Sequence, residues 1–568
     1  MENMPSITPK TRNQSRKLSW FSVGRWFEQH SHWGIVLCAV LFILLGAATL
    51  HYYGITWDEG LGNLFFGEKN LRYLTSFDPG NLNVNIDVSP RIPNDLAVNL
   101  LPARQYPFSF PGLTDIPPTI TKYIFSYWLK WFNPIDGFHL YTIFLVGLFL
   151  WFFFRFTSFR LGKYAALLAL IFLGTFPRFW GDMHFNIKDV PETVFFSLTL
   201  MTYLAWYESP SWKRALTAGV FMGCAVGVKA NGIFIPFFLL AATIPWNLKK
   251  QSWLEFLGHF RKYYLHYGIM VLSSVGVYIL SWPFLYSNPY LGLKSYWGEI
   301  FHMGVGGESH WQVNALLQAV TTMPEIMLFF LGIGLVIIAG LVFRENKVFW
   351  HLILVWLIFP ILRVSIPSAV NVDGIRHFLE FVPAAALIAG FGMEKSINWV
   401  TGKKWLPKWS ARLIALSLIL VNLLQIYFLF FPYLHLYYNQ FTGGLYGARE
   451  GFLGKEASDY WAVSYRPGME WLNDNAPLNS KLVVPVAGWV ANIEAPVILR
   501  ADIQVIQSMP DGMEMQSSKE PYYIMFILRQ NLGNAEDEVD YTMNRGKLVH
   551  QIVVDRVPVM YIYQFGGE

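Results

Sequence analysis

Long apolar runs recur along this chain of 568 residues, and most are close to the roughly 20 residues that a helix needs to cross a bilayer. Within lipid every backbone polar group must be hydrogen-bonded inside the protein, so only helices or closed barrels can span it. The runs therefore predict an α-helical polytopic membrane protein with about 11 transmembrane helices. Two short runs, 214–230 and 232–247, fit either two spans or one re-entrant pair. The full set of runs is roughly 34–53, 137–154, 161–177, 190–207, 214–230, 232–247, 264–285, 323–343, 348–366, 378–394 and 411–432.

The composition agrees with a membrane protein. Apolar residues make up 54% of the chain and charged residues only 14%, whereas soluble domains are about one-quarter charged. The two cysteines, Cys38 and Cys224, both lie within apolar runs, which argues against a disulfide framework or a cysteine metal site. No cleavable signal peptide is evident, so we interpret the first apolar run as a retained anchor. The expected surroundings are a lipid bilayer, with no nucleic acid as a partner.

The placement of Lys and Arg predicts the orientation of the chain. Cytoplasmic loops of membrane proteins carry an excess of these residues. Here the basic residues alternate from one connection to the next, which places the N-terminus in the cytoplasm and, with an odd number of spans, the C-terminal part outside the inner (cytoplasmic) membrane. The residues assigned to the cytoplasmic side are Lys10, Arg12, Arg16, Lys17, Arg25, Arg155, Arg160, Lys163, Lys213, Arg214, Lys249, Lys250, Arg261, Lys262, Arg344, Lys347, Lys395, Lys403, Lys404, Lys408 and Arg412.

These assignments divide the chain into three parts. Residues 1–33 form a cytoplasmic tail, and residues 34–432 form the transmembrane domain with two long outer loops, 54–136 and 286–322. Residues 433–568 are predicted to fold into a small extracytoplasmic α/β domain, because about 135 residues can hold a core of their own. Within it, a helix-like "PGMEWLNDNA" precedes the strand-like runs "SKLVVPVAGWV", "PVILRADIQVIQ", "YYIMFIL" and "LVHQIVVDRVPVMYIY".

Polar residues gather in three of the outer connections. Asp58 and Glu59 follow the first span in "TWDEG". "PRFWGDMHFNIKDVPE" (177–192) links the third and fourth spans, and "VNVDGIRHFLEF" (370–381), with Asp373, links the ninth and tenth. Because polar groups held at one membrane face usually serve a function, these clusters predict a site. Its candidate residues are Asp58, Glu59, Arg178, His184, Asn186, Lys188, Asp189, Arg376 and His377.

The carboxylates in these clusters also have a purely structural interpretation. Thr56-x-x-Glu59 fits a capping box, which would use Glu59 to start a helix but leave Asp58 unexplained. Asp189-x-x-Glu192 fits the same pattern before the fourth span. Capping and chemistry therefore both remain open for these carboxylates.

The basic residues have structural interpretations too. Arg376 and His377, taken alone, fit interface anchors, and His184 alone fits a structural histidine. No His or Cys pair has the spacing of metal ligands, so no metal site is predicted, and a divalent-metal requirement stays open. Nucleophilic Ser-His-Asp catalysis has no local signature. The case for a site rests on the predicted convergence of the three clusters on one membrane face.

Transfer of a sugar from a lipid phosphate suits such a set of residues. The acceptor hydroxyl must lose a proton as it attacks the anomeric carbon, and a carboxylate can accept that proton. The departing lipid phosphate gains negative charge, which Arg and Lys can stabilise. Apolar spans beside the site would hold a polyprenyl tail.

Several motifs also resemble a known family. The Asp-Glu pair after the first span, "GDMHFNIKDVPE", "GIRHFLEFVP", and "YYNQFTGGLYGA" followed by "DYW" are similar to a bacterial branch of the C-type, polyprenyl-phosphate-sugar-dependent membrane glycosyltransferases. This branch is related to the protein O-mannosyltransferases and to the lipid A aminoarabinose transferase. The resemblance covers the whole membrane region and reaches the start of the predicted outer domain.

The resemblance implies an inverting glycosyltransferase that moves a sugar from a polyprenyl-phosphate lipid to a hydroxyl acceptor and needs no organic cofactor. The family's first-loop aspartate acts as the base, a role that falls on Asp58 with Glu59 beside it. Its outer basic residues hold the phosphate, which points to Lys188, Arg376 and His377. The sugar and the acceptor, whether a glycan, a lipid or a protein, stay open.

Two other classes of protein also fit a polytopic chain. A transporter, or a flippase for lipid-linked saccharides, would place charges within its spans and often shows inverted repeats, whereas here the charges lie in loops and no repeat is visible. A sensor that binds a ligand in its outer domain would leave Asp58 without chemistry. Sugar transfer from labelled lipid donors separates the three.

Overall fold

The computed structural model describes residues 21–86, 96, 110–246, 250–307, 309–345, 347–451, 453–506, 509–510, 515–516, 518–529, 532 and 535–566. Most of the predicted cytoplasmic tail, with its basic residues up to Lys17, lies outside this part. Helices dominate what is described, and the strands β1 to β5 all follow residue 480.

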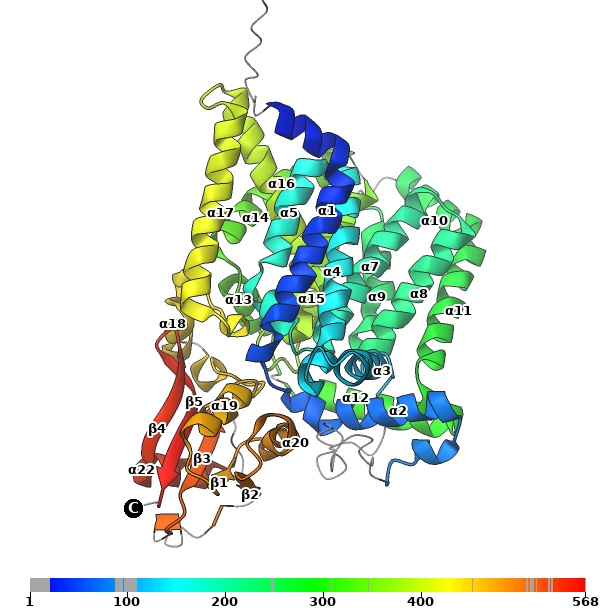
Figure 1. Cartoon of the computed structure of the whole chain (residues 1–568). Helices are drawn as coiled ribbons and strands as arrows, with labels where there is room; N and C mark the ends of the chain where they lie inside the picture. The colour runs from blue at the N-terminus through cyan, green and yellow to red at the C-terminus, as the bar shows by residue number, and fades with distance from the viewer. Residues whose placement is uncertain are drawn as a thin grey trace, which may run out of the picture.

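Each predicted apolar run coincides with a helix, and these helices pack side by side into a bundle (Figure 1). Small residues at the contacts between such helices allow them to pack closely within lipid. The bundle helices are α1 (Phe21–Thr49), α4 (Pro134–Leu161), α5 (Lys163–Gly174), α7 (Asp189–Glu208), α8 (Trp212–Val228), α9 (Ile235–Thr243), α11 (Tyr264–Leu280), α14 (Glu325–Glu345), α15 (Val348–Arg363), α16 (Phe381–Gly402) and α17 (Lys408–Phe430).

Not all of these helices are long enough to cross a bilayer by themselves. Among the described residues, four segments qualify by length and composition: Gly34–Tyr52, Pro134–Leu161, Glu325–Glu345 and Lys408–Phe430. A fifth candidate is the pair α10 (Lys250–Lys262) and α11, which is bent by 60° at its break. Others are shorter, such as α5 with 12 residues and α15 with 16. The chain is thus a membrane-embedded helical protein, while the count of about 11 spans stays a prediction.

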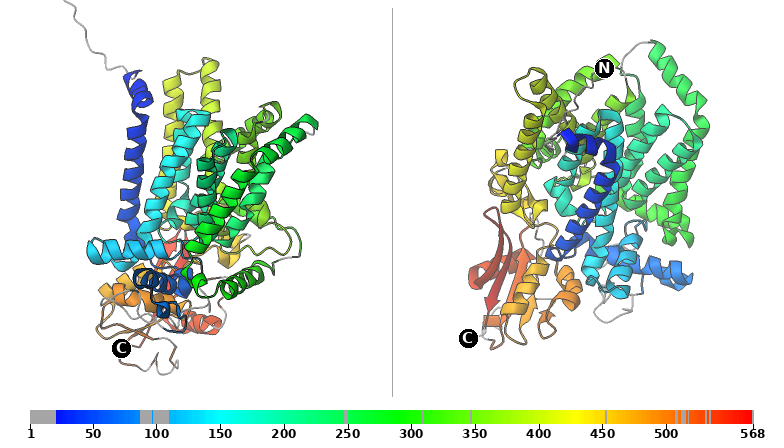
Figure 2. Two further views of the ribbon diagram at one scale, coloured as in Figure 1. Left: turned by 90° about the vertical axis from the view of Figure 1, so that its right-hand side faces the viewer. Right: turned by 45° about the horizontal axis from the view of Figure 1, so that its top comes forward.

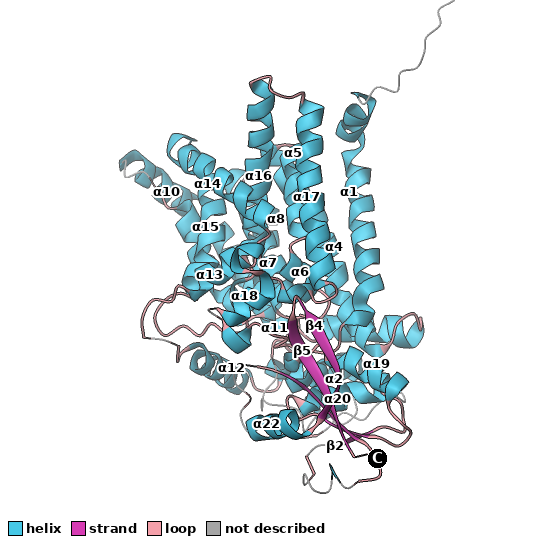
Figure 3. Cartoon of the chain, turned by 90° about the vertical axis from the view of Figure 1, so that its left-hand side faces the viewer, coloured by secondary structure: helices cyan, strands magenta, loops and turns pink. Residues whose placement is uncertain are grey.

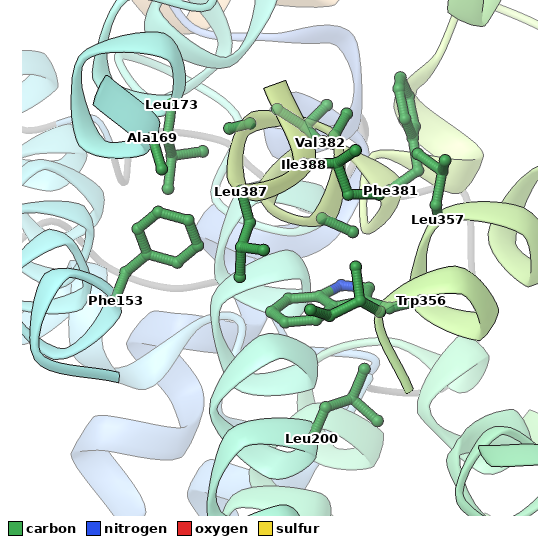
Figure 4. Close-up of a cluster of buried hydrophobic side chains, with 14 of the residues drawn as sticks. Phe153, Ala169, Leu173, Leu200, Trp356, Leu357, Phe381, Val382, Leu387 and Ile388 are labelled. Atoms are coloured by element: carbon green, nitrogen blue, oxygen red, sulfur yellow. The ribbon is translucent and has the colours of Figure 1, made fainter. Parts of the chain in front are cut away.

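The core of the bundle is centred on α16. Figure 4 shows Leu387 of α16 between Phe153 of α4 and Trp356 of α15, and all three side chains are buried. Small residues let the neighbouring helices approach closely: a Cβ added to Gly390 would lie 2.4 Å from the backbone nitrogen of Ala169 on α5. These closely packed helices hold the connections at both ends of the bundle in place.

Short helices lie across one end of the bundle, which also adjoins the sheet, and we call it the sheet end (Figures 1 and 2). They include α2 (Leu64–Ser76), α3 (Ile116–Lys122) and α12 (Pro289–Gly304). Three further short helices are α6 (Pro177–Asp182), α13 (Asn314–Thr321) and α18 (Gly444–Glu450). The opposite end carries α10 and the turn between α16 and α17 (Figure 1).

The last part of the chain folds into a five-stranded sheet with helices, as Figure 3 shows in magenta and cyan. The strand order is β2-β1-β3-β5-β4, with β2, β1 and β3 parallel and β3, β5 and β4 antiparallel. The elements are α19 (Tyr465–Asn475), β1 (Lys481–Val483), α20 (Gly488–Ile498), β2 (Gln504–Ile506), β3 (Tyr522–Ile527), α22 (Glu536–Arg545), β4 (Lys547–Val554) and β5 (Val557–Phe565).

Two strand predictions are wrong in part. The run "PVILRADIQVIQ" begins within helix α20, which ends at Ile498, and forms a strand only over Gln504–Ile506. The run "SKLVVPVAGWV" forms a strand only over Lys481–Val483, and its second half begins helix α20. Ala487 adopts a left-handed φ of 51°, which turns the chain out of the extended conformation. A short apolar run that is buried on all sides looks the same in a strand and in a helix, so the sequence pattern could not separate them.

The sheet and the first long loop share one hydrophobic core. Ile55, Phe65 and Phe66 of that loop lie in the same buried cluster as Val490 and Ile493 of α20. The predicted division into a transmembrane domain and a separate outer domain therefore crosses a continuous core, which fixes the sheet against the sheet end of the bundle.

Candidate active site

The loop that contains Asp58 is held by the segment before α19. The backbone N–H of Gly54 donates to the carbonyl of Val463 at 3.1 Å, and that of Trp57 donates to the carbonyl of Trp461 at 3.1 Å. Glu494 of α20 accepts a hydrogen bond from the N–H of Ile55. Because these bonds hold the backbone on both sides of Thr56, they also fix the position of the neighbouring backbone of Asp58.

Asp58 lies between two cations. Its Oδ2 is 3.2 Å from Nη1 of Arg376 and 3.7 Å from Nζ of Lys188. The side chain is 29% exposed, so one face of the carboxylate stays open. Burial raises the pKa of Asp58, but Lys188 and Arg376 together lower it more, and the net pKa lies below the ordinary value of an aspartate. Asp58 is therefore ionised near neutral pH.

Glu59 forms the capping box that the sequence suggests. The N–H of Thr56 donates to Oε2 of Glu59 at 2.6 Å, and the N–H of Glu59 donates to the Thr56 hydroxyl at 3.3 Å. Its other oxygen, Oε1, is 3.0 Å from Nε2 of His139 on α4. The Glu59 side chain is fully buried. It therefore holds the loop from the protein interior and, unlike Asp58, is not exposed.

The connection between α6 and α7 turns Lys188 toward Asp58. Oδ1 of Asn186 accepts the N–H groups of Lys188 at 3.2 Å and Asp189 at 2.8 Å, which closes the turn and starts α7. Asp189 is buried and pairs with Lys229 at 2.6 Å. The predicted capping box of Asp189 and Glu192 is therefore wrong. Lys188 is the N-cap residue of α7, and the Asn186 oxygen accepts the N–H groups of Lys188 and Asp189 from the turn before the helix.

The connection between α15 and α16 supplies Arg376. Its Nη2 is 2.8 Å from Oδ2 of Asp373, and its guanidinium lies 4.7 Å from the ring centre of Trp461. The carbonyl of His377 accepts hydrogen bonds from Arg363 and Asn231. Burial, with the nearby charges of Lys229, Arg376 and Arg363, holds the pKa of His377 well below its ordinary range, so its ring is neutral.

Arg178 lies on α6 and His184 just after it, and in the part of the chain that the structure describes neither forms a hydrogen bond or an ion pair with Asp58. Arg178 donates through Nε to the carbonyl of Tyr437 at 3.1 Å and lies 4.4 Å from the ring centre of Tyr438. His184 hydrogen-bonds Thr49 through Nε2 at 2.8 Å. Burial lowers the pKa of His184 to about 4 against its backbone hydrogen bonds, so this ring too is neutral near pH 7.

Asp182, also on α6, is a buried carboxyl close to these groups. Burial raises its pKa to about 8, with Arg178 opposing and Asp189 adding to the rise. Asp182 is thus mostly protonated near neutral pH, in contrast to Asp58. Asp58 therefore remains the ionised carboxylate that lies between Lys188 and Arg376.

A large apolar cavity lies elsewhere, between α1, α5, α6 and α17. Its volume is about 610 Å³, and its walls include Phe42, Leu170, Trp180 and Leu423. Asp58, Lys188 and Arg376 are not among its lining residues. The cavity faces the apolar part of the bundle and is separate from the charged cluster.

The arrangement brings together three of the predicted residues, Asp58, Lys188 and Arg376, in one charged cluster. A carboxylate held in this way can accept a proton, and its cations can turn to a competing anion. Within the described residues, no group of three or more His, Cys, Asp and Glu side chains could hold a metal ion.

Lys229 and Trp461 also belong to the site, although neither is among the predicted site residues. Lys229 pairs with Asp189, and Trp461 both holds the loop of Asp58 and covers Arg376. Lys229 did carry a signal, since it is a charged residue in "GVKANG", close to the end of the predicted run 214–230. Trp461 lies in the "DYW" motif, but its role could not be predicted from that motif because it depends on contacts between distant segments.

Comparison with known proteins gives matches among solved structures only. No family model matches the chain, and no curated protein matches it. A structure of ArnT from Cupriavidus metallidurans bound to undecaprenyl phosphate is 12% identical, covers 93% of this chain and 98% of its own, and has a TM-score of 0.48. The Archaeoglobus fulgidus oligosaccharyltransferase AglB, in complex with an inhibitory peptide and a dolichol-phosphate, is 11% identical over 88% of this chain and 70% of its own, with a TM-score of 0.46.

These solved structures come from the group of membrane glycosyltransferases that the motifs resemble, and ArnT is the lipid A aminoarabinose transferase. Identities of 11–12% and TM-scores of 0.46–0.48 do not assign an activity. The chain is similar to these proteins, and its function has to be inferred from its own residues.

Proposed function

We propose that this chain is an inverting glycosyltransferase that moves a sugar from a polyprenyl-phosphate lipid donor to a hydroxyl of a glycan, lipid or protein at the outer face of the cytoplasmic membrane. The observation that carries the proposal is Asp58, a partly exposed carboxylate 3.2 Å from Arg376 and 3.7 Å from Lys188 at the end of an apolar helix bundle. The reaction needs a proton acceptor and phosphate-binding cations at one place beside lipid.

The chemistry uses Asp58 as the general base. The acceptor hydroxyl gives its proton to a carboxylate oxygen of Asp58 while its own oxygen bonds to the anomeric carbon. The bond from that carbon to the phosphate oxygen breaks, and its electron pair stays on the lipid phosphate. Because the hydroxyl attacks opposite the leaving group, the configuration inverts. Lys188 and Arg376 stabilise the charge that the phosphate gains.

The other predicted residues support this pair of cations and their base. Asn186 shapes the turn that presents Lys188, and Asp189 anchors the same turn through Lys229. Glu59 holds the loop of Asp58 as its cap. Arg178, His184 and His377 shape the surrounding connections as mainly structural groups, since two of them are neutral and Arg178 is bonded elsewhere.

The bilayer supplies the rest of the donor's environment. The apolar helices would hold the polyprenyl tail, with the N-terminus in the cytoplasm and the sheet outside, as the basic loops predict. The donor we propose is of the same chemical class as the undecaprenyl phosphate and dolichol-phosphate named for the two solved structures.

A transfer assay tests the proposal. Purified protein in detergent or vesicles is given a panel of radiolabelled polyprenyl-phosphate sugars together with candidate hydroxyl acceptors. Asp58→Asn keeps the size and polarity of the side chain but cannot accept the proton. We expect transfer to fall by about 10²- to 10⁴-fold.

Asp78→Asn is the matched control, because Asp78 is an exposed residue of the same loop and asparagine can also make its turn. Equal thermal stability of the two variants and the wild type shows that all three fold. Near wild-type transfer by a folded Asp58→Asn variant would remove the general base from the mechanism. Movement of the intact lipid-linked sugar across vesicles, without transfer, would favour a flippase.

A further inference from the structure

Arg529 reaches the charged cluster from the sheet. It follows strand β3, and its Nη2 is 3.1 Å from Oδ1 of Asp373. Its guanidinium also lies 4.3 Å from the ring centre of Trp57, the residue before Asp58. Its side chain is only 20% exposed, so most of it is covered by other parts of the protein.

The loop geometry presents Asp373 to two guanidinium groups at once. Asp373 and Gly374 both adopt left-handed backbone conformations, with φ of 59° and 74°. Aspartate and glycine tolerate this region better than other residues. The turn directs one carboxylate oxygen of Asp373 to Arg529 and the other to Arg376, at 3.1 and 2.8 Å.

A series of ion pairs connects Arg529 to Asp58. Arg529 pairs with Asp373, Asp373 with Arg376, and Arg376 with Asp58. The guanidinium of Arg529 also covers the ring of Trp57, the residue before Asp58, so Arg529 contacts the Asp58 loop directly as well. With Lys188, the cluster holds three cations and two carboxylates, which leaves one positive charge.

That remaining positive charge depends on Arg529. Without it the cluster is neutral, and Asp373 has Arg376 as its only partner in the cluster. Two cations that share one carboxylate repel each other, so each of them is held less strongly than it would be alone. Arg376 is then freer to bind another anion. The pair Asp189 and Lys229 beside the cluster is balanced and does not change this sum.

We propose that Arg529 is a positioning residue through which the sheet keeps Arg376 available to the lipid phosphate of the donor. This inference rests on the proposed function, since it assigns the anion to that donor. Arg529 touches neither the carboxylate of Asp58 nor the reacting atoms; it acts through Asp373 and Arg376. Its removal weakens donor binding and leaves turnover of bound donor nearly unchanged.

Two substitutions of Arg529 test the proposal, with Arg545→Gln as the control. Arg545 is an exposed arginine on α22 of the same sheet region. The probe for binding is undecaprenyl phosphate in detergent micelles, and KM and kcat are measured with the donor that the wild type uses. Arg529→Gln should raise the Kd and the KM about five- to tenfold, with kcat within about twofold. Arg529→Lys keeps the charge and should recover most of the affinity.

A double substitution tests the route through Asp373. In an Asp373→Asn background the carboxylate that Arg529 shares is gone, so Arg529→Gln should cost much less affinity than in the wild type. An equal loss in both backgrounds, or an unchanged Kd in a folded Arg529→Gln variant, overturns the inference. If Arg529→Gln does not fold, Arg529→Met, which also removes the charge, gives the same comparison with Asp373→Asn and the double variant.

The two proposals fail in different ways. Wild-type protein that transfers sugar while Arg529→Gln binds the lipid phosphate normally overturns the inference alone. Wild-type protein that binds undecaprenyl phosphate but transfers no sugar from any donor overturns the proposed function, and the binding data still decide the role of Arg529. Wild-type protein that does not bind the lipid phosphate overturns both.

Discussion

Asp58 shares its cations with the anion that the reaction releases. In the free protein Lys188 and Arg376 lie against its carboxylate and outweigh the effect of burial, so its pKa is lowered. A carboxylate with a lowered pKa stays ionised in mild acid but is a weak base. When the donor phosphate draws the cations away, the pKa of Asp58 rises and its carboxylate becomes a stronger base at the moment it is needed.

The pH dependence of the reaction should record this change. Activity falls as the pH drops through the pKa of the base, in kcat/KM for the free protein and in kcat for the complex with donor. We expect the acid limb of kcat/KM below the ordinary aspartate value of 3.8 and the limb of kcat at higher pH. Initial rates between about pH 2.5 and 8 at low and saturating donor measure both limbs.

Lys188→Met removes one of the two cations and serves as the comparison. The acid limb of its kcat/KM should lie at higher pH than in the wild type, closer to the limb of kcat. The reason is that one of the two cations that lower the pKa of Asp58 is gone. A wild-type kcat limb that lies below the kcat/KM limb contradicts the exchange of cations between Asp58 and phosphate.

At the scale of elements, the loop after α1 and helix α20 are joined by a buried carboxyl. Glu494 accepts a hydrogen bond from the N–H of Ile55, and among the described residues its Oε2 has no hydrogen-bond partner. Burial raises its pKa to about 8, against the opposing effects of that hydrogen bond and of Arg466. The protonated form therefore dominates in the folded chain near neutral pH.

This carboxyl makes the stability of the fold depend on pH. Its folded-state pKa of about 8 exceeds the ordinary 4.5, so its contribution is full below about pH 4.5 and is lost as the pH rises through 8. Glu494→Gln keeps the acceptor oxygen and cannot ionise. We expect the drop in Tm between pH 6 and 9 to be about 1–3 °C smaller in this variant than in the wild type.

Thermal unfolding in detergent measures the difference, with Glu450→Gln as the control at an exposed position. Asp115 and Asp182 also have a pKa raised to about 8 by burial, so part of the drop should remain in Glu494→Gln. Equal drops in the two proteins would show that Glu494 does not stay protonated in the fold.

The sequence predicts helices well here and long-range pairs poorly. The apolar runs coincide with helices because length and apolar character are local properties. Asp58, Lys188 and Arg376 were found because charged residues are conspicuous beside apolar spans. Arg529 could not be predicted from the sequence, since its partner Asp373 is 156 positions away. The two side chains meet only because the end of β3 lies against the connection between α15 and α16.

On the scale of the whole molecule, the bundle separates two unlike ends. The sheet and the charged cluster lie at one end, and α10 and the turn between α16 and α17 lie at the other (Figure 1). Leu478 is 74% exposed beside the sheet, and Trp405 is 64% exposed in the turn. These two positions can report which end faces which side of the membrane.

Labelling of single cysteines tests the orientation. In a background with Cys38→Ala and Cys224→Ala, Leu478→Cys should react with a membrane-impermeant maleimide on right-side-out vesicles. Trp405→Cys should react less by about tenfold or more until the vesicles are opened, because a bilayer excludes the charged reagent. Equal labelling of both positions in sealed vesicles would contradict the predicted topology.

The pairing of the Asp58 loop with the sheet region sets a time at which the site can exist. Ile55 and Glu494 are 439 positions apart, so a chain that is still being made and inserted has the loop long before it has the partner. Until then the N–H of Ile55, which the finished fold buries, lacks its acceptor, an omission that costs about 1–3 kcal/mol in a buried setting. Asp58, Lys188 and Arg376 are all present once residue 376 has been made, yet their arrangement waits for the sheet. Chains that end early thus contain every proposed reacting group and remain unable to use them, which ties activity to the completion of synthesis.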